Sequence, residues 1–174
     1  MKASDAYCDT DTLFSNAARH ARDAKSQAEA TAIRSLMSKH DQGKIRLLRS
    51  NVARRELENT ADVRQRDSLR KEFFERVPVA KDEKLLGFDT QYTDPYGGFV
   101  TNPLVSDVQD ERLCAELENS LKLRKFDAQQ LGQAISNQCG TFLTRDSDFL
   151  KSAGTIEQRY GIKVLPPSVF DAQN

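Results

Sequence analysis

The sequence predicts an α/β protein in which helices cover both faces of a central, mainly parallel sheet of about four to five strands, a three-layer α/β/α sandwich. Short apolar runs alternate with longer stretches whose apolar residues recur at helical spacing, as in parallel βαβ units. The chain has 174 residues, 38% of them hydrophobic, which suits one domain with one core. Acidic residues repeatedly follow the apolar runs, where the active crevice of such a sheet lies.

The first half of the chain contains two predicted strands, each followed by a helical pattern. Alanines at helical spacing favour a long first helix, and the segment from Asp41 to Gly43 is typical of a helix end and turn. The second helical pattern changes phase near residues 59–60 and ends at Pro78. In chain order, these elements are a strand over 6–8, a helix over about 15–39, a strand over 45–48 and a helical stretch over about 51–76.

The second half opens with a segment of different character. Residues 78–106 are rich in glycine, proline and aromatic residues, so we expect a long loop or an insertion within a single domain that spans residues 1–174. Regular patterns then resume. They predict helices over about 107–121, 127–139 and 153–160, and strands over 141–144 and 162–165, the last closed by Pro166-Pro167.

Composition limits where the protein acts. No apolar run is long enough for a transmembrane helix, and the N-terminus has no apolar stretch of signal-peptide length, so we expect a cytoplasmic protein without membrane contact. The three cysteines stand far apart, without a CxxC pair. With only two histidines, a structural zinc site is not expected, and the cysteines are interpreted as buried, reduced thiols.

Net charge is zero, but one stretch is locally basic. Between Arg34 and Arg55, basic residues outnumber the single acid, Asp41. Such a stretch can attract a phosphate backbone, although solvated helix faces explain it equally well. The candidate RNA-binding residues are Arg46, Arg49, Arg54 and Arg55.

Acidic residues from distant segments are expected to meet at one edge of the sheet. Asp9 and Asp11 follow the first strand, and Asp146 and Asp148 follow the strand over 141–144. Two further acids are associated with helices: Glu56 lies early in the helix after the second strand, and Asp127 opens the helix over 127–139.

Each of these acids also has a structural explanation. Asp127 could cap its helix in a capping box with Gln130, and Asp146 and Asp148 could be turn residues. Glu56 could face solvent. As a group, however, clustered carboxylates repel one another unless a cation neutralises them. Oxygen-only ligands select Mg²⁺ or Mn²⁺, and such an ion is suited to phosphodiester hydrolysis.

Five segments resemble motifs of the PIN domain family of ribonucleases. Ala6–Phe14 resembles the opening strand of the family, which runs into Asp-Thr-x-x-Leu, and Ser50–Leu57 resembles the second motif, a serine followed by a helix with a Glu. Phe126–Ile135 resembles the helix that carries the third acid. Phe142–Phe149 resembles the Thr-x-Asp-x-Asp-Phe turn, and Tyr160–Leu165 resembles the closing strand. The resemblance covers most of the chain except about 78–106.

This resemblance implies a PIN-like sandwich and a metal-dependent endoribonuclease. Water activated by metal and carboxylate would attack phosphorus in line and leave a 5′-phosphate and a 3′-hydroxyl. The resemblance further implies an RNA substrate, a homodimer and possible pairing with an antitoxin protein. The implied catalytic and metal-holding residues are Asp9, Glu56, Asp127 and Asp146, with Asp148 as an additional ligand and Asp11 and Thr144 in support.

Two other functions remain open. Asp9-Thr-Asp11-Thr also resembles the opening motif of haloacid-dehalogenase-type phosphatases, in which Asp9 would be the nucleophile and Asp11 the general acid. That interpretation leaves Glu56 and Asp127 without a role. A PIN-like module that binds RNA or protein without catalysis is the second alternative.

Overall fold

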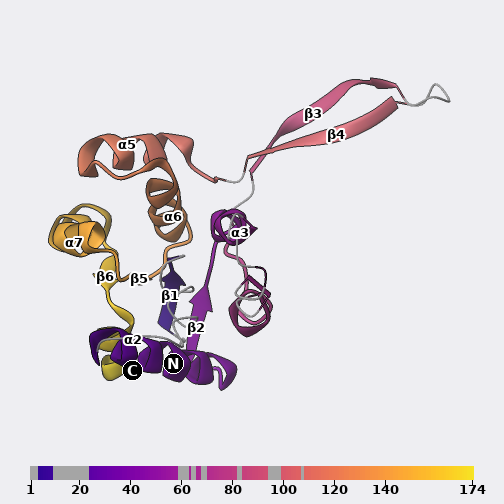
Figure 1. Ribbon diagram of the computed structural model, residues 1–174. Helices are drawn as coiled ribbons and strands as arrows, with labels where there is room; N and C mark the ends of the chain where they lie inside the picture. Colours follow the sequence, from indigo (N-terminus) through magenta and orange to yellow (C-terminus); the bar gives the residue numbers. More distant parts are fainter. Residues whose placement is uncertain are drawn as a thin grey trace.

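The computed structural model describes residues 4–9, 24–58, 63, 66–67, 70–81, 84–93, 99–106 and 108–174, some of them by their backbone alone. In this part of the chain the strands are β1 Ser4–Cys8, β2 Ile45–Leu48, β3 Lys84–Thr93, β4 Phe99–Ser106, β5 Thr141–Leu143 and β6 Lys163–Leu165. The helices are α2 Ala24–Asp41, α3 Asn51–Glu58, α5 Glu111–Leu121, α6 Lys125–Ser136, α7 Ser147–Tyr160 and α8 Pro167–Gln173, with a π-helical turn, η1, at Arg70–Phe74. Figure 1 shows their arrangement, which confirms the α/β class.

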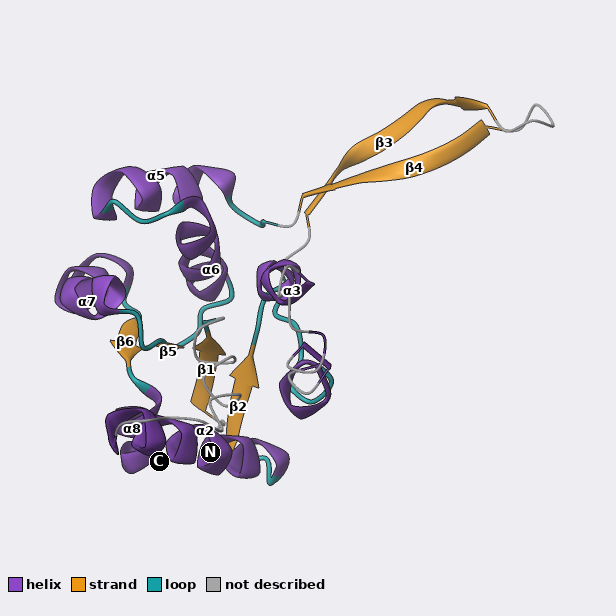
Figure 2. Cartoon of the chain, in the orientation of Figure 1, coloured by secondary structure: helices purple, strands orange, loops and turns teal. Residues whose placement is uncertain are grey.

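Four of the strands form one parallel sheet in the order β2-β1-β5-β6 (Figure 2). β1 is central, and its Ala6 pairs with Leu47 of β2 on one side and with Thr141 of β5 on the other. Parallel strands of this kind are buried on both faces, which explains why most of the buried positions in these short segments are apolar. The sheet is parallel, as predicted, and its four strands in the described residues agree with the expected four to five.

Alternate residues of the strands point to two separate hydrophobic clusters. Ala6 and Cys8 belong to one cluster, which includes residues of α2, α3, η1 and α8. Tyr7, between them, belongs to the other, which includes residues of α5, α6 and α7. Because successive strand side chains point to opposite faces, helices cover both sides of the sheet. This arrangement is compatible with a three-layer α/β/α sandwich.

Several helix boundaries differ from those predicted by periodicity. α2 ends at Asp41, and Gly43 makes the following turn with φ +69°, as the sequence predicts; residues 15–23 of the predicted helix lie outside the described residues. α3 ends at Glu58, and residues 59–62, where the break is predicted, also lie outside them. α6 begins two residues earlier than predicted, at Lys125, and α7 begins at Ser147, where Asp146 caps it.

The segment after Pro78 contains regular structure. β3 and β4 pair as an antiparallel hairpin with irregularities between Leu85 and Gly87 and between Asp89 and Tyr92. In Figure 1 this hairpin extends away from the parallel sheet and its helices. The insertion expected over 78–106 therefore contains a hairpin. Gly87 lies at one of the irregularities, and Pro103 lies in a two-stranded ribbon, in which both strands are edge strands that tolerate proline.

α8 is a helix that the sequence analysis does not predict. Pro166 and Pro167 occupy its N-cap and first positions, where proline needs no hydrogen-bond donor and its fixed φ favours a helix. Phe170 is buried in the cluster that includes α2, and Lys39 of α2 binds Asp171 at 2.8 Å. The two prolines therefore begin a helix that covers one face of the sheet.

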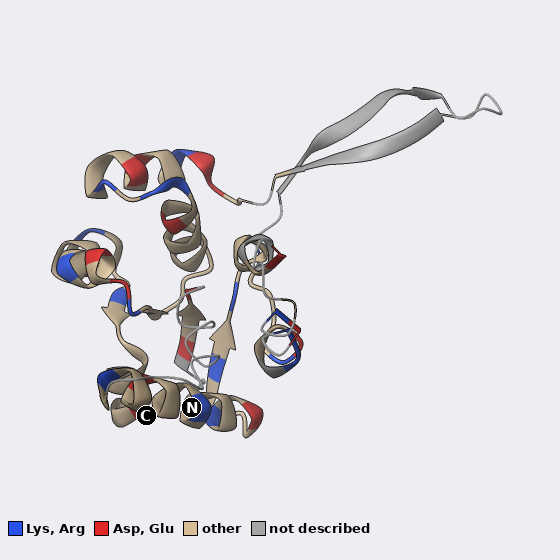
Figure 3. Ribbon diagram, in the orientation of Figure 1, with Lys and Arg blue, Asp and Glu red and all other residues tan. Residues whose placement is uncertain are grey.

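The described helices α2, α5 and α7 each have both acidic and basic residues (Figure 3).

None of the helices in the described residues is long and apolar enough to cross a bilayer.

Candidate functional site

Asp9 and Thr144 lie together at the carboxyl ends of two neighbouring strands. Cys8 of β1 pairs with Leu143 of β5, and the Asp9 N–H continues the ladder by donating to the Leu143 carbonyl at 3.0 Å. The Asp9 side chain is only 4% exposed, and its Oδ2 accepts a hydrogen bond from the Thr144 hydroxyl at 2.7 Å. A buried carboxylate needs such donors, because burial without them is costly. Thr144 thus fixes the orientation of Asp9.

Asp146 is joined to the same pair through the backbone. Its N–H donates to the Thr144 hydroxyl at 3.0 Å, so this hydroxyl links Asp9 to Asp146. One oxygen of Asp146, Oδ1, accepts from the Asp148 N–H at 2.7 Å and caps α7. Its other oxygen, Oδ2, lies 3.8 Å from a guanidinium nitrogen of Arg124. The turn role expected for Asp146 is therefore present, together with a second contact that capping does not require.

Asp127 comes to this point from α6. The helix begins at Lys125 with Arg124 as its N-cap, so Asp127 lies in the first turn and does not open the helix. The alternative role of Asp127 as the capping residue is excluded, because Arg124 occupies the N-cap position. The Asp127 carboxylate Oδ2 instead accepts from Arg124 Nε at 2.8 Å. Negative charge in the first turn of a helix is stabilised by the helix dipole. Asp127 is thus placed by the start of α6 and oriented by Arg124.

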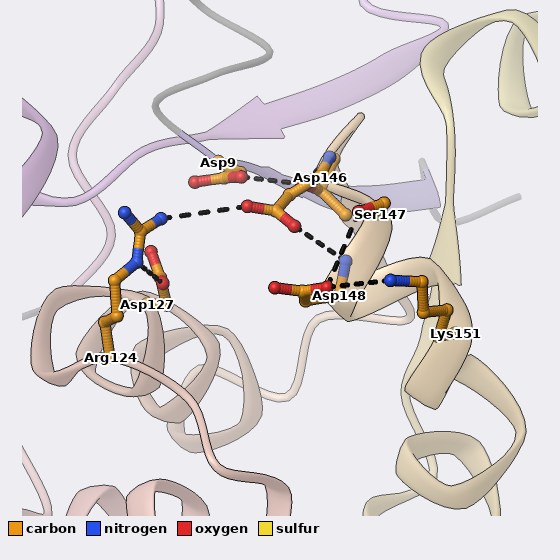
Figure 4. Close-up of polar contacts among 8 residues, drawn as sticks. Asp9, Arg124, Asp127, Asp146, Ser147, Asp148 and Lys151 are labelled. Atoms are coloured by element: carbon orange, nitrogen blue, oxygen red, sulfur yellow. Dashed lines mark hydrogen bonds and ion pairs between the residues drawn. The ribbon is translucent and has the colours of Figure 1, made fainter.

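Asp9, Thr144, Asp146, Arg124 and Asp127 form one network of hydrogen bonds and ion pairs, the acid network. Figure 4 shows the carboxylates of Asp9, Asp127 and Asp146 pointing toward a common region, with Arg124 reaching into it from α6. Exposure rises across the network: the side chain of Asp127 is 16% exposed and that of Asp146 is 29% exposed. Solvent therefore reaches the carboxylates of Asp127 and Asp146, whereas Asp9 is buried.

Other predicted acids stand apart from this network or outside the described residues. The carboxylate of Asp148 is 76% exposed and pairs with Lys151 at 3.1 Å, so Asp148 contributes to the network through its N–H. Glu56 is on α3, which contacts α6, but its side chain is outside the described residues, as is all of Asp11. Ser50 is fully buried and accepts from the Ala53 N–H, so it caps α3.

The basic residues predicted to bind RNA have local partners where their side chains are described. Arg46 pairs with Asp5 across β1 and β2 at 3.6 Å. Arg49 donates to the carbonyls of Val77 and Phe74 at 3.0 and 2.8 Å, so it fixes the chain after η1. For Arg54 and Arg55 only the backbone is described, within α3. These contacts give Arg49 a structural role that the sequence pattern does not reveal.

Comparisons with protein-family models, with curated proteins and with solved structures found no match to this chain. Its chemistry is therefore inferred from its own residues and their geometry.

The fit of a metal ion can be tested on the donors themselves. Within the described residues, no three carboxylate, imidazole or thiol groups are spaced as a ready metal site. The donors of the acid network are nevertheless all oxygens, which suit Mg²⁺ or Mn²⁺. A cation, the Arg124 guanidinium, already lies between Asp127 and Asp146. The position thus accommodates positive charge, and its oxygen donors are of the type that a hard metal ion takes.

The cysteines are unsuited to catalysis. All three are free and buried. Burial, with the neighbouring Asp9 charge as a second cause, raises the pKa of Cys8 far above its usual range. Burial, followed by the charge of Asp110, raises the pKa of Cys114 to about 11. Because the thiolate is the nucleophile, these two thiols stay protonated and inert near neutral pH.

Arg124 is the member of the network that sequence reasoning missed. Its side chain makes no capping hydrogen bond, although Ser, Thr, Asp and Asn are the residues preferred at an N-cap. The spacing of Arg124 and Asp127, three residues apart at a helix start, is the only local signal for their pair. Its contact with Asp146 depends on how the folded chain places α6 beside the start of α7.

Proposed function

We propose that this chain is a metal-dependent endoribonuclease with a PIN-like three-layer sandwich. The observation that carries the proposal is the acid network, which joins Asp9, Asp127 and Asp146 from distant parts of the sequence through Thr144 and Arg124. Mg²⁺ or Mn²⁺ would be held by these three acids. Glu56 is included as a fourth because its helix, α3, contacts the helix of Asp127.

Two acids of the network then have distinct roles in hydrolysis. The bound ion would polarise the phosphate and lower the pKa of the attacking water. Asp9, held by Thr144, provides a fixed and buried negative charge. Asp146, whose Oδ2 takes no part in the cap of α7, would accept the proton of the attacking water. The new bond joins the water oxygen to phosphorus, the bond to the 3′-oxygen breaks, and that oxygen takes a proton from solvent, which leaves a 5′-phosphate and a 3′-hydroxyl.

The biological setting is part of the same proposal. The protein would act in the cytoplasm, as the toxin of a toxin–antitoxin pair and as a homodimer. Three free, buried cysteines support a reducing compartment. An amphipathic antitoxin segment bound in a groove between helices would give the expected inhibition.

The proposal is tested by incubating the purified protein with mixed structured RNA in Mn²⁺ or in EDTA. We expect cleavage in Mn²⁺, none in EDTA, and 5′-phosphate ends on the products. Asp127→Asn should reduce the rate by about 100-fold or more, as loss of a group that acts on the transition state does. Glu157→Gln is the matched control, because it neutralises an exposed carboxylate on α7 outside the acid network.

The same preparation distinguishes the alternatives. Hydrolysis of p-nitrophenyl phosphate that depends on Asp9 but not on Asp127, without RNA cleavage, would favour the phosphatase. Equal loss of cleavage in Asp127→Asn and Glu157→Gln would show that the acid network is not the active centre. Absence of both activities, with RNA binding retained, would favour a non-catalytic interaction module.

A further inference from the structure

Arg124 occupies an unusual place in the acid network. It is the N-cap residue of α6, yet its side chain caps nothing in the helix. It extends instead to Asp127 at 2.8 Å through Nε and to Asp146 at 3.8 Å through Nη2. These two carboxylates belong to different elements, so the guanidinium connects the start of α6 to the start of α7 (Figure 4).

We propose that Arg124 is a displaceable counter-ion, which holds Asp127 and Asp146 together in the metal-free protein and leaves them when a divalent cation binds. This inference rests on the metal site of the proposed function. In the metal-free protein the repulsion between the two carboxylates needs a nearby positive charge. A planar guanidinium with several donors in a fixed fork can contact both at once.

The exposure of Arg124 makes the displacement inexpensive. Its side chain is 79% exposed, so the guanidinium is already largely hydrated, and the incoming ion would take its place beside Asp127, whose side chain is 16% exposed. Exposed ion pairs of this kind contribute little to stability. A divalent ion has twice the charge and a much smaller radius, so its attraction to the same two carboxylates is stronger. The arginine thus acts as a positioning residue that competes with the metal.

The test compares Mn²⁺ binding by calorimetry to the full chain and to two variants, Arg124→Gln and Lys125→Gln. Lys125 is the next residue, and its variant makes the same change in net charge on an exposed position. We expect Arg124→Gln to bind Mn²⁺ about twofold to fivefold more tightly than Lys125→Gln, the range that exposed ion pairs imply. Equal affinity in the two variants, or weaker binding by Arg124→Gln, would overturn the inference.

Unfolding provides a second readout. In EDTA, Arg124→Gln should be less stable than Lys125→Gln, and saturating Mn²⁺ should remove the difference. Arg124→Lys keeps a charge without the fork, so its affinity for Mn²⁺ should fall between those of the native chain and Arg124→Gln. If Arg124→Gln remains less stable than Lys125→Gln in saturating Mn²⁺, Arg124 has only a structural role, and the inference that the metal displaces it is overturned.

The outcome also separates this inference from the proposed function. If the native chain binds Mn²⁺ and Asp127→Asn does not, the metal site stands, and the Arg124 variants alone decide the role of the arginine. If the native chain binds no Mn²⁺, the metal site fails and the competition fails with it.

Discussion

A single hydroxyl, that of Thr144, determines how two of the acids are held. Thr144 is fully buried, donates to Asp9 at 2.7 Å and accepts from the Asp146 N–H at 3.0 Å. Asp9 follows β1, whereas Asp146 begins α7, so this contact connects the sheet to a helix. A buried carboxylate that loses a donor retains its full desolvation cost. The site therefore depends on a residue that need not touch the substrate.

Thr144→Val keeps the shape of this side chain and removes its hydroxyl. We expect the free energy of unfolding to fall by about 1–3 kcal/mol, because Asp9 and the Asp146 N–H each lose a partner. Mn²⁺ affinity or RNA cleavage should fall by about 10–100-fold, as when an outer partner of a metal ligand is removed. Urea unfolding and calorimetry measure the two effects.

Thr141→Val is the control for this prediction. Thr141 is buried in β5, which ends directly before Thr144, and its hydroxyl is outside the acid network. The variant should change Mn²⁺ affinity little. Equal effects of the two substitutions on metal affinity would show that strand packing, and not the hydroxyl, supports the site.

Some residues of the site could be predicted from sequence and others could not. Asp9 and Asp146 follow apolar runs, so their meeting at one edge follows from parallel strand order alone. The role of Arg124 requires the packing of α6 against its neighbours, which no local pattern encodes. Arg49 shows the converse, because a residue within a basic stretch binds backbone carbonyls of Phe74 and Val77.

At the scale of elements, α5 and α6 approach closely where α6 has a glycine. A Cβ at Gly132 would lie 2.8 Å from the sulfur of Cys114 on α5 and 3.7 Å from Leu117. The glycine therefore allows the contact between the two helices. Gly154 in α7 differs, because a Cβ there would meet no atom within 4 Å.

These two glycines provide a matched pair of substitutions. Each change to alanine gains about 1 kcal/mol of helix propensity. Gly132→Ala also forces an overpacked contact that costs about 1–3 kcal/mol. We therefore expect Gly154→Ala to raise the free energy of unfolding and Gly132→Ala to be less stable than Gly154→Ala by about 1–3 kcal/mol, measured by urea unfolding.

The double variant Cys114→Ala, Gly132→Ala tests the cause. Removing the sulfur should restore part of the loss, so the two changes should be non-additive, as for residues in contact. Additive effects would indicate that the sulfur of Cys114 does not limit the approach of the helices.

Sequence patterns predict the elements where apolar periodicity dominates and miss some of those next to proline and glycine. β1, β2 and β5 follow directly from buried apolar runs. Pro166-Pro167 ends β6, as predicted, but the same residues also begin a helix, α8, whose Phe170 is buried. The choice between these outcomes depends on the tertiary contact with α2, which a local pattern does not contain.

At the scale of the whole molecule, described residues on both flanks of the β3–β4 hairpin contact the same region of the chain. Before the hairpin, the Lys81 N–H donates to Asn137 at 2.9 Å, and after it, the Gln109 N–H donates to Gln133 at 3.4 Å. The Asn137 side chain also binds the Gln133 carbonyl at the end of α6. Both ends of the insertion therefore reach the same end of one helix.

Replacement of residues 85–105 by a short glycine-serine linker should leave the parallel sheet and its helices intact. Lys84 pairs with Ser106, so the two ends are about 5 Å apart and a few flexible residues can join them. We expect one cooperative thermal transition with a Tm within about 4 °C of the native value, since the hairpin strands pair chiefly with each other. Mn²⁺ affinity should also be retained, because the acid network contains no residue of the insertion. Aggregation of the shortened chain would indicate that the hairpin is needed for folding. A shortened chain that folds but no longer binds Mn²⁺ would indicate that the hairpin contributes to the metal site.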